Sequence, residues 1–217
     1  MKLPHAPSLP GFTPGTRLMT EHGERRVETL CPGDLLMTRD AGLQPLLATV
    51  TRTLAADRDN APIAVTNALF SNAKRTLLVS PTQSLLVENW RAEMLFGQRQ
   101  VLVQARHMID GDRAFDLPRS GVMYVHLILP AHHLLVSEGV PVESLLMADT
   151  TPAILSIGCE PSLGENIHHL ASKHAAHRPV RRHLTQAEAS ALISANGDTF
   201  PRRPRRKMAP VTKLTLI

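Results

Sequence analysis

The sequence predicts a mainly β fold of short strands, followed by a small helical C-terminal extension. The first observation is the spread of 17 prolines and 12 glycines along 217 residues, which is typical of frequent turns and short elements. The second is a series of short aliphatic runs bounded by turn residues. The third is a change after Asp149, where two helix-capping signals appear.

The predicted strands start near the N-terminus and are separated by tight turns. We expect a first hairpin around His22-Gly23, because glycine beside a polar residue favours a turn. Ser80-Pro81-Thr82-Gln83 separates two later apolar runs, and Pro81 predicts a turn there because proline cannot donate a hydrogen bond within a sheet. The expected strands cover residues 17–20, 25–27, 35–38, 76–79, 85–87, 101–103 and 122–129.

Helical periodicity replaces this pattern in the last third of the chain. Ser162 with Glu165 forms a capping box, and apolar residues at i, i+3 and i+4 then predict an amphipathic helix that ends before Pro179. Thr185 with Glu188 forms a second capping box. It predicts a short helix that stops at Asn196-Gly197.

Positive charge is concentrated at the C-terminal end. The formal net charge is +5, but residues 1–150 hold 14 Lys and Arg against 15 Asp and Glu. Residues 151–217 hold 10 against 4. We therefore expect the run Arg202–Lys207 to be an extended tail that makes at most a weak, salt-sensitive contact with acidic or phosphate-rich surfaces. Aromatic residues make up only 3% of the chain, which argues against binding through stacked nucleic-acid bases.

Four parts are predicted along the chain. They are a short leader (1–10), a β domain (11–149), a helical extension (150–197) and a flexible basic tail (198–217). No apolar stretch has the length of a signal-peptide core or of a membrane span. We therefore expect a monomer that is cytoplasmic by default, with no partner identified.

Several motifs of the β domain occur together in one known family. They are the opening Gly11-Phe-Thr-Pro-Gly-Thr16, the turn Pro32-Gly33-Asp34, and the segments 78–81, 90–97, 101–107 and 124–139. In order and spacing they resemble the Hint (hedgehog/intein) domain family, in its bacterial branch, over about residues 10–147. The resemblance implies the Hint fold and a self-processing (autoproteolytic, protein-splicing) ancestry.

In that family the chemistry begins with a cysteine that opens the domain. Its thiolate attacks the preceding peptide carbonyl and converts an amide into a thioester. The corresponding position here, directly before Phe-Thr-Pro-Gly-Thr, is Gly11, which has no side chain. The resemblance therefore implies that the nucleophile is lost.

The family's second element is a Thr/Ser-x-x-His motif, whose histidine protonates the departing amine. Here the hydroxyl of Ser80 is kept, but Gln83 stands at the histidine position, and a carboxamide cannot deliver a proton at neutral pH. His126 and His132 remain on the late strands that the resemblance places over the active site. They can titrate near neutral pH.

These departures predict a Hint domain that is catalytically degenerate. Whether the domain acts as an enzyme stays open. Two alternatives remain. One is an active self-processing domain with non-standard chemistry, for instance attack by Ser8 or Ser80. The other is a binding module that acts through the basic tail.

Other residues with potential chemistry are expected to be structural. Cys31 and Cys159 lie far apart without CxxC spacing, and we expect Cys31 to be a turn residue. We expect no cofactor and no metal, because the histidine cluster 168–177 lacks carboxylates or cysteines at matching spacing. Trp90 is expected to be a core or bracing residue. His132-His133 is expected to be a strand pair with one ring inside and one outside.

Overall fold

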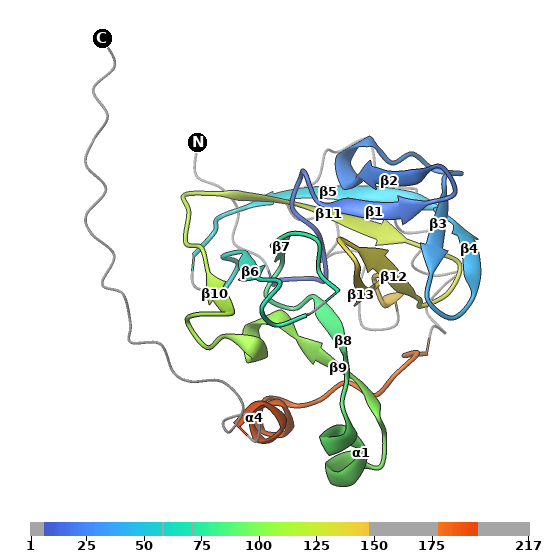
Figure 1. Cartoon of the computed structure of the whole chain (residues 1–217). Helices are drawn as coiled ribbons and strands as arrows, with labels where there is room; N and C mark the ends of the chain where they lie inside the picture. Colours follow the sequence, from blue (N-terminus) through green and yellow to red (C-terminus); the bar gives the residue numbers. More distant parts are fainter. Residues whose placement is uncertain (1–6, 58, 71, 148–177, 195–217) are drawn as a thin grey trace.

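The computed structural model describes residues 7–57, 59–70, 72–147 and 178–194 (Figure 1). Its helical segments are α1 (Trp90–Phe96), α4 (Gln186–Ser194) and two 3-10 turns, η1 (Val27–Thr29) and η2 (Ala105–Met108). The strands are β1 (Arg17–Thr20), β2 (Gly23–Arg26), β3 (Leu35–Thr38), β4 (Gly42–Pro45), β5 (Ala48–Leu54), β6 (Ile63–Val65), β7 (Leu77–Val79), β8 (Ser84–Glu88), β9 (Gln100–Gln104), β10 (Ala114–Asp116), β11 (Val122–Ile128), β12 (Leu134–Ser137) and β13 (Val140–Glu143).

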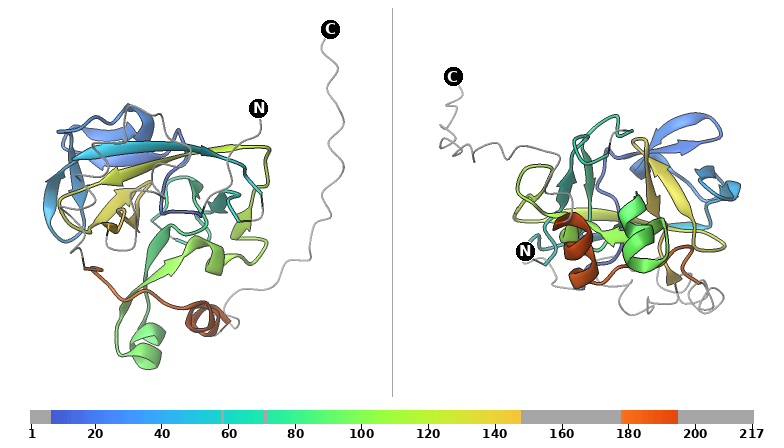
Figure 2. Two further views of the ribbon diagram at one scale, coloured as in Figure 1. Left: turned by 180° about the vertical axis from the view of Figure 1, so that it is seen from behind. Right: turned by 60° about the horizontal axis from the view of Figure 1, so that its bottom comes forward.

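Within the described residues the strands form three antiparallel sheets. The largest has the order β2-β1-β3-β12-β13-β8-β9, with β4 paired to β3. A second sheet has the order β10-β6-β7, and the third is the long ribbon of β5 and β11. Figures 1 and 2 show this ribbon running across the molecule beside β1 and β2, with β8, β9 and α1 extending from the opposite side.

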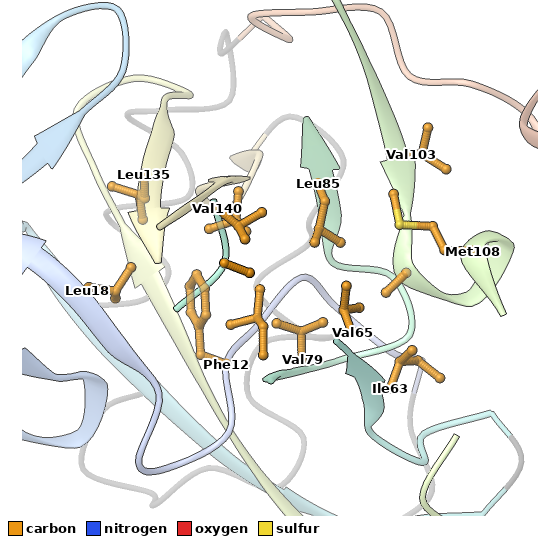
Figure 3. Packing of buried hydrophobic residues seen from close by; sticks show 14 of the residues in the cluster. Phe12, Leu18, Ile63, Val65, Val79, Leu85, Val103, Met108, Leu135 and Val140 are labelled. Atoms are coloured by element: carbon orange, nitrogen blue, oxygen red, sulfur yellow. The ribbon is translucent and has the colours of Figure 1, made fainter. Parts of the chain in front are cut away.

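Phe12 joins two of the sheets. It forms an antiparallel bridge with Val79 of β7 and another with Val125 of β11. Its ring is buried in the main core, and Figure 3 shows it among Leu18, Val79 and Val140. This packing fixes the backbone of Gly11, the preceding residue, between β7 and β11.

The C-terminal helix α4 packs on the same core. Its capping box forms as predicted, because Glu188 accepts a hydrogen bond from the Thr185 N–H (2.9 Å) and its own N–H donates to Thr185 Oγ1 (3.3 Å). Ala189 and Leu192 belong to the main hydrophobic cluster. Residues 182–184 pair with Leu102 of β9 through hydrogen bonds from Leu102 N to Arg182 O (2.8 Å) and from Leu184 N to Leu102 O (2.9 Å).

The expectation of a mainly β fold with a small C-terminal helix is confirmed, but two local predictions are wrong. Trp90 is not a core residue: it is 62% exposed, because Asn89 caps α1 there and the helix buries only Ala92. His132 and His133 do not lie in a strand. They precede β12, with His132 buried and His133 half-buried. The helix predicted from Ser162 and the Arg202–Lys207 tail lie outside the described residues.

Candidate functional site

The Pro10–Gly11 peptide bond, here called the junction, is held by hydrogen bonds on both sides. The Gly11 N–H donates to Ser80 Oγ (3.1 Å), and the Ser80 N–H donates back to Gly11 O (2.9 Å). On the other side, Pro10 O lies 2.7 Å from His126 Nδ1. Ser80 directly follows β7 and His126 lies on β11, so the two strands that flank Phe12 also position the two side chains at the junction.

The bond to Pro10 determines the tautomer of His126. A carbonyl oxygen only accepts, so Nδ1 carries the proton. Complete burial lowers the pKa of His126 to about 4; the hydrogen bond to Pro10 opposes this shift and the positive charge of Arg52 adds to it. The ring is therefore neutral at neutral pH. Its Nε2 atom is buried and has no hydrogen-bond partner among the described residues.

His126 also occupies the space where a side chain at position 11 would begin. A Cβ atom built on Gly11 would lie 2.7 Å from His126 Nδ1 and 2.8 Å from Cε1. Real Cβ contacts are essentially never this short, and the ring is fully buried. Any residue other than glycine at this position requires the His126 ring to move.

Gln83 lies in the same turn as Ser80 but its side chain points elsewhere. Its Nε2 donates to the backbone carbonyl of Glu143 (2.8 Å) and, less well, to that of Ser84 (3.4 Å). No hydrogen bond in the described part of the chain joins the Gln83 side chain to Pro10 or Gly11.

His132 belongs to a second buried group, here called the Glu143 cluster: Glu143, His132, His183 and Ser84. Glu143 Oε1 accepts from the Ser84 N–H (2.9 Å), and Oε2 lies 2.7 Å from His183 Nε2. His132 Nδ1 accepts from the Val180 N–H (3.2 Å), which leaves its proton on Nε2, 3.4 Å from Glu143 Oε2. That distance is long for a hydrogen bond, so this contact is the weaker one.

The carboxylate of Glu143 stays ionised in this cluster. Burial alone would raise the pKa of Glu143, but contacts with His132, His183 and Ser84 outweigh burial and lower it to about 2. His183 comes from the segment that precedes α4, so the cluster connects the C-terminal segment to β8 and β13.

The structure thus brings together three of the five residues expected at the site. Gly11, Ser80 and His126 meet at the junction. Gln83 and His132 contact Glu143 instead, Gln83 at its backbone carbonyl and His132 at its carboxylate. Sequence reasoning did not single out Glu143, Arg52 or His183. Arg52 was missed because residues 48–54 were not predicted as a strand. Within β5, alternation places Arg52 on the same buried face as Val50 and Leu54.

The remaining observations lie away from the junction. A cleft of about 500 Å³ is lined by none of the five expected residues; its lining is Gln98, Arg99, Gln100, Pro179, Val180, Arg181 and Arg182.

Cys31 is an exposed turn residue with a free thiol, whereas Cys159 and the histidines 168–177 lie outside the described residues. The described ranges contain no group of three His, Cys, Asp or Glu placed to hold a metal ion, and no helix with the length and apolarity of a membrane span.

Comparisons with known proteins identify the family. The chain resembles the solved structures of the gp41-1 intein (11% identity, TM-score 0.38, covering 61% of this chain and 96% of that one) and the MchDnaB-1 intein (14%, 0.40, 60% and 98%). It also resembles the solution structure of a bacterial intein-like domain from Clostridium thermocellum (12%, 0.42, 64% and 98%). No curated protein matches the chain significantly. The sequence family described as Hint domain matches residues 10–149, well over half of the chain, so this protein belongs to the Hint domain family.

Proposed function

We propose that this Hint domain keeps the fold of a self-processing module but does not cleave its own junction. The observation that carries the proposal is the position of His126. The acyl shift of this family needs a nucleophile on residue 11, whose side chain lies next to the preceding carbonyl carbon. Here residue 11 is glycine, and the His126 ring fills the place of its Cβ.

The orientation of Gln83 supports the same proposal. Breaking an amide requires a proton for the departing nitrogen. The Gln83 amide is directed to Glu143 O, and the hydroxyl of Ser80 accepts the Gly11 N–H. His126, with a pKa of about 4, donates a hydrogen bond to Pro10 O at neutral pH and holds no second proton to deliver.

A reporter fused before Met1 tests the proposal. Intact-mass spectrometry and gels, with and without added thiol, should show an uncut fusion for the parent chain. The variants Gly11→Cys and Gly11→Cys/Gln83→His restore first the nucleophile and then the acid. Cleavage that appears only in the double variant agrees with a degenerate parent, whereas a thiol-dependent cut before Gly11 in the parent contradicts the proposal.

A second candidate, cleavage by Ser80, is favoured by the contacts at the junction. Ser80 Oγ lies 3.1 Å from Gly11 N, and the His126 proton polarises the adjacent carbonyl. Attack of the Ser80 oxygen on the Pro10 carbonyl carbon would form an ester, break the amide and transfer the hydroxyl proton to the Gly11 amine. Water would then hydrolyse the ester, releasing the upstream chain as a carboxylic acid and restoring the Ser80 hydroxyl.

Ser80→Ala separates the two candidates. If the parent fusion is cut slowly and Ser80→Ala abolishes the cut, Ser80 is the nucleophile and the domain is active. Thr82→Ala is the matched control, because Thr82 lies in the same turn and its hydroxyl contacts Ser8 (3.3 Å) rather than the junction. An uncut parent excludes this candidate.

A further inference from the structure

The four residues before the junction lie in contact with the domain itself. Pro7 is exposed, Ser8 and Pro10 are half-buried, and Leu9 is 8% exposed. Leu9 belongs to a small cluster separate from the main core, formed with Val50 of β5, Ile128 of β11, Leu145 and Met147. Without the Leu9 side chain this cluster would have an apolar face open to solvent.

The hydrogen-bonding groups of residues 7–10 and of the domain surface that they contact are complementary. Proline has no N–H, so Pro7 and Pro10 present only carbonyl oxygens. The domain faces them with donors: both terminal nitrogens of Arg52 lie 3.4 Å from Pro7 O, and His126 Nδ1 lies 2.7 Å from Pro10 O. An arginine has five donors and no acceptor, so a proline carbonyl suits it well. Proline also restricts the free peptide, which reduces the entropy lost on binding.

From these contacts we infer that the β5–β11 ribbon and residues 145–147 form a peptide-binding groove that takes the chain upstream of Gly11. Its ligand class is an extended peptide with a large aliphatic side chain two residues before the junction. The Leu9 side chain provides selectivity, while the contacts of Arg52 and His126 read the backbone and accept any sequence. The inference rests on the proposed function, because only an uncut junction keeps the leader attached.

Hydrogen exchange of the full chain tests the groove. Leu9→Asp places a charge in the apolar cluster and should expel the leader. Exchange at the Ser8, Leu9 and Gly11 amides should then accelerate about 30-fold, the factor expected for one buried leucine side chain, whereas the Phe12 amide stays bonded to β11. Exchange in β11 should not change. Leu9→Met keeps the volume and should preserve protection, and Leu43→Asp, at a residue 39% exposed, is the matched control.

A labelled peptide with the sequence of residues 6–10 gives a second measurement on the same chains. In the parent the attached leader competes at high effective concentration. The peptide should therefore bind the Leu9→Asp chain at least tenfold more tightly than the parent, and a peptide with Asp in place of Leu should not bind.

The outcomes separate this inference from the proposed function. An intact mass that lacks the first ten residues contradicts the proposed function and with it the basis of the inference. A full-length chain in which Leu9→Asp exchanges like the parent overturns the inference alone. Equal peptide binding by both chains, or no binding by the Leu9→Asp chain at millimolar peptide, overturns it as well.

Discussion

The junction and the Glu143 cluster are both buried polar regions built around histidine, yet they hold opposite charge states. At the junction, His126 faces a carbonyl oxygen and lies near the positive charge of Arg52, and its pKa falls to about 4. In the cluster, Glu143 accepts from His183 and from the Ser84 N–H and lies 3.4 Å from His132 Nε2, and its pKa falls to about 2. One region excludes a charge and the other stabilises one.

The difference shows that the partners, and not burial alone, determine the ionisation of a group. Burial disfavours the charged form in both regions. Only Glu143 has enough donors to overcome that cost. The two regions should therefore respond to acid in different pH ranges and to substitution with different losses of stability.

Glu143→Ala should have the largest effect. It removes the acceptor of the Ser84 N–H and of His183 at once, and it leaves the Ser84 N–H and the His132 ring buried without the carboxylate. Removing one partner of a buried charged group costs about 4 kcal/mol of unfolding free energy. Urea unfolding measures this loss, and Glu88→Ala, whose side chain is 41% exposed, should cost less than about 0.5 kcal/mol.

Glu143→Gln should lose less unfolding free energy than Glu143→Ala, and this difference would sharpen the comparison of the cluster with the junction. The amide keeps an acceptor for the Ser84 N–H but has no charge for His183. If Glu143→Ala and Glu88→Ala cost the same, the cluster contributes no stability and the comparison fails.

The second prediction concerns the pH dependence at the junction. The pKa of His126 is about 4 in the folded chain against 6.5 for an unperturbed histidine, so the unfolded chain binds more protons between these values. Stability should fall as the pH falls from 6.5 toward 4, by about 3 kcal/mol in total. For Glu143 the loss begins only below about 4.5 and continues toward 2.

Comparing His126→Gln with the parent isolates this effect. The variant cannot titrate, so its unfolding free energy should decrease less between pH 6.5 and 4.5. His22→Gln, at a side chain 77% exposed, serves as the control and should follow the parent. If the unfolding free energy of the parent and of His126→Gln changes equally with pH, His126 is not held neutral by the fold.

Seven of the thirteen described strands were predicted, because their signals are local, whereas β4, β5, β6, β10, β12 and β13 were missed. Residues 35–38 form a strand as expected, and so do the runs on either side of Ser80-Pro81-Thr82-Gln83. The convergence of Gly11, Ser80 and His126 agrees with the family motif. The direction of the Gln83 side chain was not predictable, because it depends on β13 pairing with β8, which brings Glu143 to residues 60 positions earlier. The contact of Glu143 with His183 depends on a different long-range pairing, that of residues 182–184 with Leu102 of β9.

The smallest predicted effect tests whether the C-terminal segment depends on its helix or on the Glu143 cluster. Thr185→Ala removes the hydroxyl that caps α4, a loss of about 1 kcal/mol. The contacts of residues 182–184 with Leu102 precede the cap, so they should persist. Hydrogen exchange should therefore accelerate over residues 186–194 in Thr185→Ala, but over both residues 180–184 and 186–194 in Glu143→Ala. If Thr185→Ala also exposes residues 180–184, the helix holds the segment in place and the cluster is secondary.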